Sequence, residues 1–159
     1  MILPAARRNV GRAQQRARPK LSKICFLDHD LIFVSTEPAA GQEAYGGRCA
    51  LSGFPEHRLL NAAHIIDDGH ETLGQPIVSN GLPLTRIHHA AFDAHLIGID
   101  ADLRLHVSPR LLGQKDGPAL AALNDLHGMT PRRPLRPQDA PDRDQLAHRF
   151  EEFWNNVGA

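Results

Sequence analysis

The pattern of apolar and polar positions predicts a core of short strands in the middle of this chain. The apolar run over 59–66 ends in β-branched residues and predicts a buried strand. After a polar loop, residues 77–84 predict a turn between two extended pieces, with an Asn-Gly pair at its centre. Residues 96–108 predict a second hairpin that turns at 100–102. Strands this short, combined with helices, predict an α+β fold.

Three segments have the spacing of helices. Thr85 can cap a helix over 85–95, in which apolar contacts are expected from Ile87, Ala91 and Phe92. A second helix is predicted near 117–127. A longer amphipathic helix is predicted from Asp142 to about Asn155, with a stripe facing the core formed by Leu146, Phe150, Phe153 and Trp154.

The first forty residues differ from the rest in composition. Residues 1–24 contain no acid but carry Arg7, Arg8, Arg12, Arg16, Arg18, Lys20 and Lys23, although the whole chain has a formal net charge of zero. Such a segment suits a polyanionic partner, because binding to phosphates releases counterions, and it suits equally a solvated terminus. Residues 23–35 predict a hairpin or two short strands. Residues 36–47 predict a linker with a turn at 46–47.

Length and cysteine content narrow the class of protein. A chain of 159 residues is expected to form one domain. Cys25 and Cys49 form no CxxC pair, which excludes a four-cysteine zinc site and a disulfide framework. No apolar run approaches the roughly 20 residues of a membrane span, and no signal-peptide core is present, so we expect a cytoplasmic protein.

The candidate chemistry lies between residues 64 and 93. His64 falls in the predicted strand, Asn80 precedes His89 by nine positions, and His89 precedes Asp93 by four, so His89 and Asp93 share a helix face and could bind one metal ion. Each residue also has an ordinary explanation: a core or surface histidine, a turn asparagine, and a surface His–Asp pair. His88 could contact phosphate or pack, and Arg86, at the start of the helix, could contact phosphate.

This order of residues, with C-A-L-S-G at 49–53, A-A-H-I-I at 62–66, N-G-L at 80–82 and H-H-A-A-F-D at 88–93, resembles the HNH endonuclease family. The form of these motifs resembles a restriction-endonuclease branch of that family. The resemblance implies a ββα-metal (HNH/His-Me finger) core with flanking short hairpins and C-terminal helices. It implies a phosphodiester hydrolase that acts on DNA with a divalent metal ion, with Mg²⁺ or Mn²⁺ expected first and Zn²⁺ or Ni²⁺ as alternatives.

The resemblance also implies a role for each residue. His64 would be the general base, Asn80 would brace the hairpin and fix that histidine, and His89 with Asp93 would bind the metal. Arg86 and His88 would contact nucleic acid. Many members of the family place an acid or a histidine before the base, where this chain has Ala63. A ligand in its place could come from water, the substrate phosphate or the loop, where the candidates are Asp67, Asp68, His70 and Glu71.

We therefore divide the chain into a basic N-terminal tail with a short hairpin, both of unknown role (1–40), an HNH nuclease domain (41–112) and a C-terminal helical extension (113–159). Two alternatives remain open. One is a non-catalytic DNA-binding module that keeps the fold, and the other is an interaction protein whose histidines bind zinc incidentally. The sequence does not determine sequence specificity or oligomeric state.

Overall fold

The computed structural model describes residues 38–67, 69–70, 74 and 77–157. Within these residues the elements follow in the order α1 (Pro38–Ala44), η1 (His57–Leu59), β1 (Leu60–His64), η2 (Val78–Asn80), β2 (Gly81–Thr85), α2 (Arg86–Asp93), β3 (Ile97–Ile99), β4 (Leu105–Val107), α3 (Pro109–Leu112), α4 (Pro118–Asn124), η3 (Pro137–Asp139) and α5 (Arg143–Val157). This mixture of helices with two small antiparallel sheets confirms the predicted α+β class. The hairpin and the basic segment predicted within residues 1–35 lie outside the described residues.

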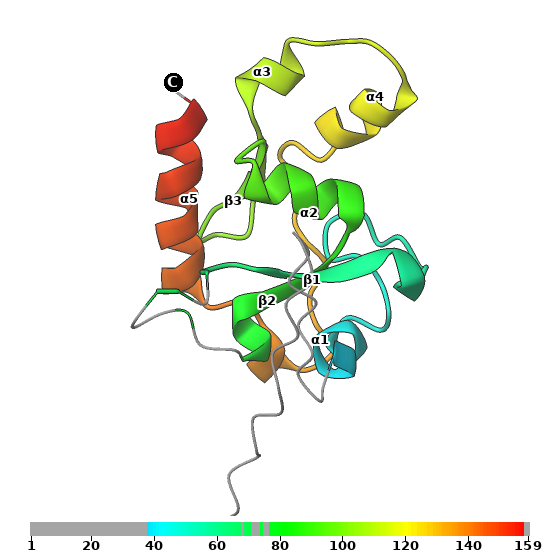
Figure 1. Cartoon of the computed structure of the whole chain (residues 1–159), viewed down its shortest axis with the longest axis vertical. Coiled ribbons are helices and arrows are strands. Elements are labelled where there is room, and N and C mark those ends of the chain that lie inside the picture. The colour runs from blue at the N-terminus through cyan, green and yellow to red at the C-terminus, as the bar shows by residue number, and fades with distance from the viewer. Residues whose placement is uncertain (1–37, 68, 71–73, 75–76, 158–159) are drawn as a thin grey trace, which may run out of the picture. The chain divides into compact units, whose positions relative to one another are not determined.

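The central unit is a hairpin followed directly by a helix. Strands β1 and β2 pair antiparallel, with Leu60 opposite Thr85 and His64 opposite Gly81. The hairpin contacts α2 on one side and α1 on the other, as the green and cyan elements of Figure 1 show. Thr85 ends β2 and caps α2, because its hydroxyl accepts a hydrogen bond from the His88 backbone N–H, as predicted.

The second hairpin, β3–β4, packs against the long C-terminal helix α5. The carboxylate of Asp100 closes its turn, accepting hydrogen bonds from the backbone N–H groups of Asp102 and Arg104 at 2.9 Å each. Gly98 lets the helix approach the strand, because a Cβ at this position would lie 2.6 Å from the Phe153 ring. The predicted hairpin and the predicted terminal helix are therefore both present, and they form one packing layer.

Two predicted segments have a different structure from the one expected. The predicted linker over 36–47 contains helix α1, because Pro38 suits the first helical position and alanines, Gln42 and Glu43 follow it. The turn at Gly46 and Gly47 is present, with φ of 62° and 67°. Residues 78–80 form the 3-10 turn η2 instead of an extended piece.

Two residues predicted to face the core are exposed. Ile87 is 52% exposed and Trp154 is 63% exposed. The buried side of α2 is centred on His88, and position 87 lies roughly 100° from it around the helix. Trp154 similarly follows the buried Phe153 by one position, so both predictions assigned an edge residue to the buried stripe.

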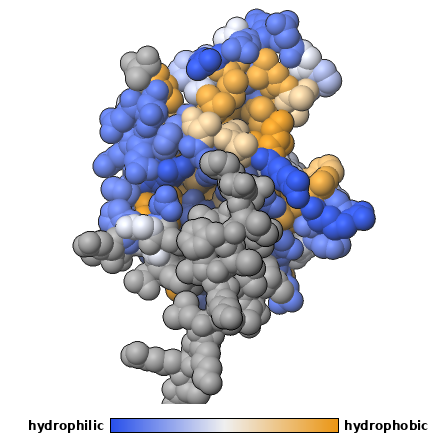
Figure 2. All heavy atoms as spheres, in the orientation of Figure 1, coloured by the Kyte–Doolittle hydropathy of each residue, from blue (hydrophilic) through white to orange (hydrophobic). Residues whose placement is uncertain are grey.

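Side-chain hydropathy differs between the parts of the surface visible in Figure 2. Apolar side chains gather over the region of α3 and α4, and hydrophilic side chains cover α5. None of the helices between residues 38 and 157 combines the length and apolar character needed to cross a membrane.

Candidate active site

The candidate base lies at the last position of β1. Along this strand Ala63 is fully buried, whereas Ala62 is exposed and His64 is half-buried. Successive residues of a strand point to opposite faces, so the buried Ala63 directs the neighbouring His64 away from the core. An apolar strand thus carries a partly exposed imidazole at its end.

Asn80 holds the chain immediately after that histidine. Its backbone carbonyl accepts a hydrogen bond from the N–H of Ile65 at 2.9 Å. Its side-chain amide forms a pair of bonds with Ile66, accepting from the backbone N–H at 2.9 Å and donating to the carbonyl at 3.0 Å. Asn80 is fully buried, so these bonds replace those that its amide would make with water. The exit of β1 is therefore fixed within two residues of His64.

One face of α2 carries the polar residues singled out in the sequence. Arg86, His89 and Asp93 recur at spacings of three and four, which places them along one face of the helix. We call these three residues the open face of α2. Arg86 is exposed, and the side chains of His89 and Asp93 are 25% and 57% exposed. The Nε2 atom of His89 lies 3.2 Å from Oδ2 of Asp93.

The opposite side of the helix contains the neighbouring histidine. We call His88, Ala91 and Phe92 the buried face of α2. His88 is 8% exposed, and its Nδ1 lies 2.8 Å from the Thr85 hydroxyl and 3.3 Å from Sγ of Cys49. The structure thus favours packing over phosphate contact for His88, and Arg86 is the better candidate for nucleic acid.

The Cys49–His88 contact was not anticipated from the sequence, because 39 residues separate the two side chains. Burial acts to raise the pKa of the Cys49 thiol, but hydrogen bonds with His88 and Ser52 outweigh it and lower the pKa to about 6. No sequence motif links Cys49 with His88, so this pair could not be predicted from the sequence.

A polar hollow of about 400 Å³ is lined by residues after β1 and by α5, and neither His64 nor the open face of α2 is part of its lining. Its lining includes Asp67 and His70, two of the loop residues proposed to complete a metal shell, together with His148 and Arg149 of α5. The other two loop candidates, Asp68 and Glu71, lie outside the described residues. His95 also lines the hollow, where burial and the Arg149 cation lower its pKa.

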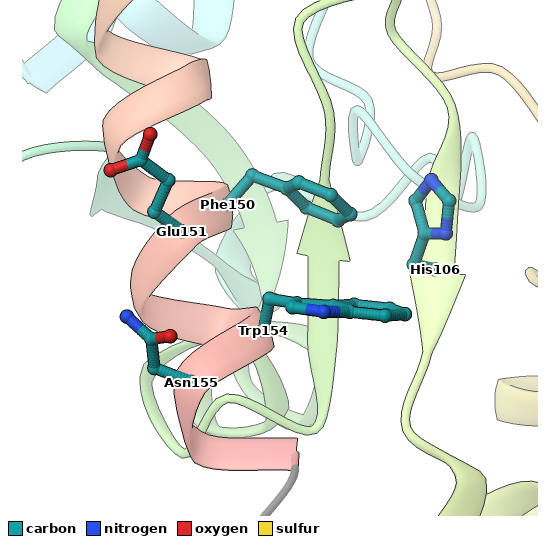
Figure 3. A pocket seen from close by; sticks show the side chains of 5 residues that line it. All are labelled: His106, Phe150, Glu151, Trp154 and Asn155. Atoms are coloured by element: carbon teal, nitrogen blue, oxygen red, sulfur yellow. The ribbon is translucent and has the colours of Figure 1, made fainter.

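A second hollow, of about 570 Å³, is bounded by α5 and β4 and is more aromatic. Figure 3 shows Phe150 and Trp154 projecting from α5 toward His106 on β4, with Glu151 and Asn155 on the far side of the helix. The ring centroids of Phe150 and His106 are 4.7 Å apart. None of the predicted site residues lines this hollow.

Two side chains of the open face are candidate donors for a metal ion. His89 and Asp93 supply a nitrogen and a carboxylate oxygen close enough to bind one ion together. Within the described residues, no three His, Cys, Asp or Glu side chains gather closely enough to hold a metal. A nitrogen and a carboxylate oxygen are donors that suit a divalent ion.

Comparison with known families finds a similarity in the central unit. The family model described as HNH endonuclease matches residues 49–100, which contain the hairpin, α2 and the first strand of the second hairpin. Residues 49–100, which we call the HNH segment, are therefore similar to the HNH endonuclease family over about a third of the chain. His64, Asn80, His89 and Asp93 all lie within the HNH segment, whereas α5 lies beyond it.

One solved structure, titled "Modification dependent TagI restriction endonuclease", is similar to the chain at 23% sequence identity and a TM-score of 0.49. The similarity covers 70% of this chain and 35% of that protein, so the matched part spans about a third of its length. No curated protein matches the sequence.

Proposed function

We propose that this chain is a metal-dependent DNA endonuclease with His64 as its general base. The observation that carries the proposal is the brace formed by Asn80, which fixes the backbone directly after His64 inside the HNH segment. A general base needs a defined position relative to the water it activates. Without the hydrogen bonds from Asn80, the backbone after β1 would be less fixed, and the His64 imidazole would be freer to move.

In the proposed reaction, neutral His64 accepts a proton from a water molecule as the water oxygen attacks phosphorus. The bond between phosphorus and the leaving sugar oxygen then breaks, and that oxygen takes up a proton from solvent water. His89 and Asp93 would hold the divalent ion, which when bound neutralises charge on the phosphate and leaving oxygens. Arg86, exposed at the start of α2, would bind a backbone phosphate of the DNA.

The test is nicking of supercoiled plasmid by wild-type protein and His64→Ala, with Mg²⁺, Mn²⁺, Zn²⁺, Ni²⁺ or EDTA. We expect cleavage by the wild type in at least one metal, and loss of cleavage in EDTA and in the variant. His57→Ala is the matched control, because it removes an exposed histidine just before β1. Equal cleavage by His64→Ala and wild type would contradict the role of His64. A restriction role, which is part of the proposal, requires in addition that cuts occur at defined DNA sites.

A non-catalytic DNA-binding module is the second candidate. It is favoured by Ala63, which is fully buried and pairs with Leu82 where many HNH enzymes carry a further ligand. A binding module would retard DNA in a gel without cutting it in any metal. That result, with both wild type and His64→Ala binding equally, would replace the endonuclease proposal.

A further inference from the structure

Arg149 connects the C-terminal helix to the end of α2. Its Nη2 donates a hydrogen bond to the carbonyl of Phe92 at 3.2 Å, and its guanidinium carbon lies 4.9 Å from the centroid of the Phe92 ring. A cation at the carboxyl end of a helix also interacts favourably with the helix dipole. Arg149 thus contacts the last turn of α2 although it lies outside the HNH segment.

The same guanidinium borders the carboxylate of Asp93. Oδ1 of Asp93 lies 3.9 Å from Nη2 of Arg149, while Oδ2 lies 3.2 Å from Nε2 of His89. Each oxygen therefore faces a different partner. The Asp93 side chain is 57% exposed, so a fixed orientation costs it rotational freedom that these two partners must offset.

Arg149 is itself held in place. Its side chain is 16% exposed, and its Nη1 donates to Oε2 of Glu152, one turn further along α5, at 3.0 Å. The helix that carries it is anchored by Leu146 and Phe153, which are 0% and 1% exposed. A guanidinium fixed in this way can orient a neighbouring carboxylate at little entropic cost.

We propose that Arg149 is a positioning residue for the metal pair of the open face: it holds Asp93 so that Oδ2 stays beside Nε2 of His89. This inference rests on the proposed function, because it assumes that His89 and Asp93 bind the ion. It adds a residue of α5 to a site whose other members all belong to the HNH segment. Residues that orient metal ligands typically change metal affinity tenfold to a hundredfold when they are lost.

The experiment is isothermal titration of the full chain with Mn²⁺, for wild type, Arg149→Gln, Asp93→Asn and the double variant. We expect Arg149→Gln to weaken Mn²⁺ binding by about tenfold. Because Arg149 acts through Asp93, adding Arg149→Gln to Asp93→Asn should cause no further loss, whereas a merely structural role would give additive losses. Arg143→Gln is the matched control, since this exposed arginine begins the same helix.

Arg149→Lys provides an independent check if the glutamine variant unfolds. It keeps the charge but not the fork that reaches both Phe92 and Asp93, so we expect a Mn²⁺ affinity between those of wild type and Arg149→Gln. Unchanged Mn²⁺ binding in either variant would overturn the positioning role. Tighter binding would overturn it too, because it would mean that the Arg149 cation competes with the metal for Asp93. A wild-type chain that binds no Mn²⁺ would overturn the proposed metal site as well, which distinguishes the two failures.

Discussion

The two faces of α2 use the same residue type for different purposes. His88 and His89 are adjacent in the sequence, yet His88 lies against Cys49 and Thr85 in the interior while His89 faces Asp93 near solvent. On the buried face, polar atoms satisfy one another and stabilise the fold. On the open face, side chains with partial exposure keep donors available for an ion or a phosphate. Burial, rather than residue type, therefore separates the structural histidine from the candidate catalytic one.

The largest effect is expected when His88 and His89 are replaced by alanine, each in a separate variant. His89→Ala should reduce plasmid cleavage by about 100-fold, because it removes a proposed metal ligand, with little change in stability. His88→Ala should instead lower the free energy of unfolding by about 1–3 kcal/mol, because it deprives the buried Thr85 hydroxyl and Cys49 thiol of a partner. Denaturant unfolding and plasmid nicking on the same preparations measure both. Loss of stability in His89→Ala and loss of cleavage in His88→Ala would contradict the roles assigned to the two faces.

Asn80→Ala extends the comparison to the buried amide that bonds the chain directly after the candidate base. It removes both hydrogen bonds to Ile66 and leaves the backbone groups of that residue without these partners, which should cost roughly 2–4 kcal/mol in urea unfolding. We expect cleavage to fall as well under conditions in which the variant remains folded, because the chain after His64 is no longer held. Asn155→Ala, at an exposed position on α5, is the control and should change neither quantity. Full activity in a folded Asn80→Ala protein would show that the Asn80 hydrogen bonds are not needed to position His64.

The Cys49–His88 contact makes the buried side sensitive to pH. The pKa of Cys49 is lowered from 9.0 to about 6, so between these values the unfolded chain holds a proton that the folded chain has released. Stability from this group is therefore fully present above about pH 9, and it is lost as the pH falls through about 6. Relative to Cys49→Ala, the wild type should gain stability from pH 6 to 9 with a slope approaching roughly 1.4 kcal/mol per pH unit. A difference between the two proteins that stays constant with pH would show that Cys49 remains protonated.

The smallest effect is expected at the start of the open face. Arg86→Gln removes one exposed charge, so DNA affinity should fall about threefold and the slope of log affinity against log salt should decrease by about 0.9. Arg58→Gln is the control, because the Arg58 side chain is already paired with Glu56 at 2.9 Å. Fluorescence anisotropy with duplex DNA at several salt concentrations measures both quantities. A salt slope that is unchanged in Arg86→Gln would remove Arg86 from the DNA-contacting surface.

The sequence by itself determined the features that depend on neighbouring residues. Thr85 caps α2 through a bond to its third neighbour, and Asp100 closes its turn through bonds to residues two and four positions ahead. The pairing of His89 with Asp93 follows from helical spacing. These interactions span at most one helical turn, so the order of residues is enough to predict them.

Only the tertiary structure decided which face of each element is buried and which distant residues meet there. His88 shares a helix face with Ala91 and Phe92, but only the packing of that face shows that His88 is buried and that Cys49 lies against it. Gly98 is an unremarkable strand residue until the Phe153 ring packs on it. Arg149 reaches Phe92 across 57 positions of sequence. Such contacts depend on the packing of whole elements, which burial of their apolar faces determines and which no short motif encodes.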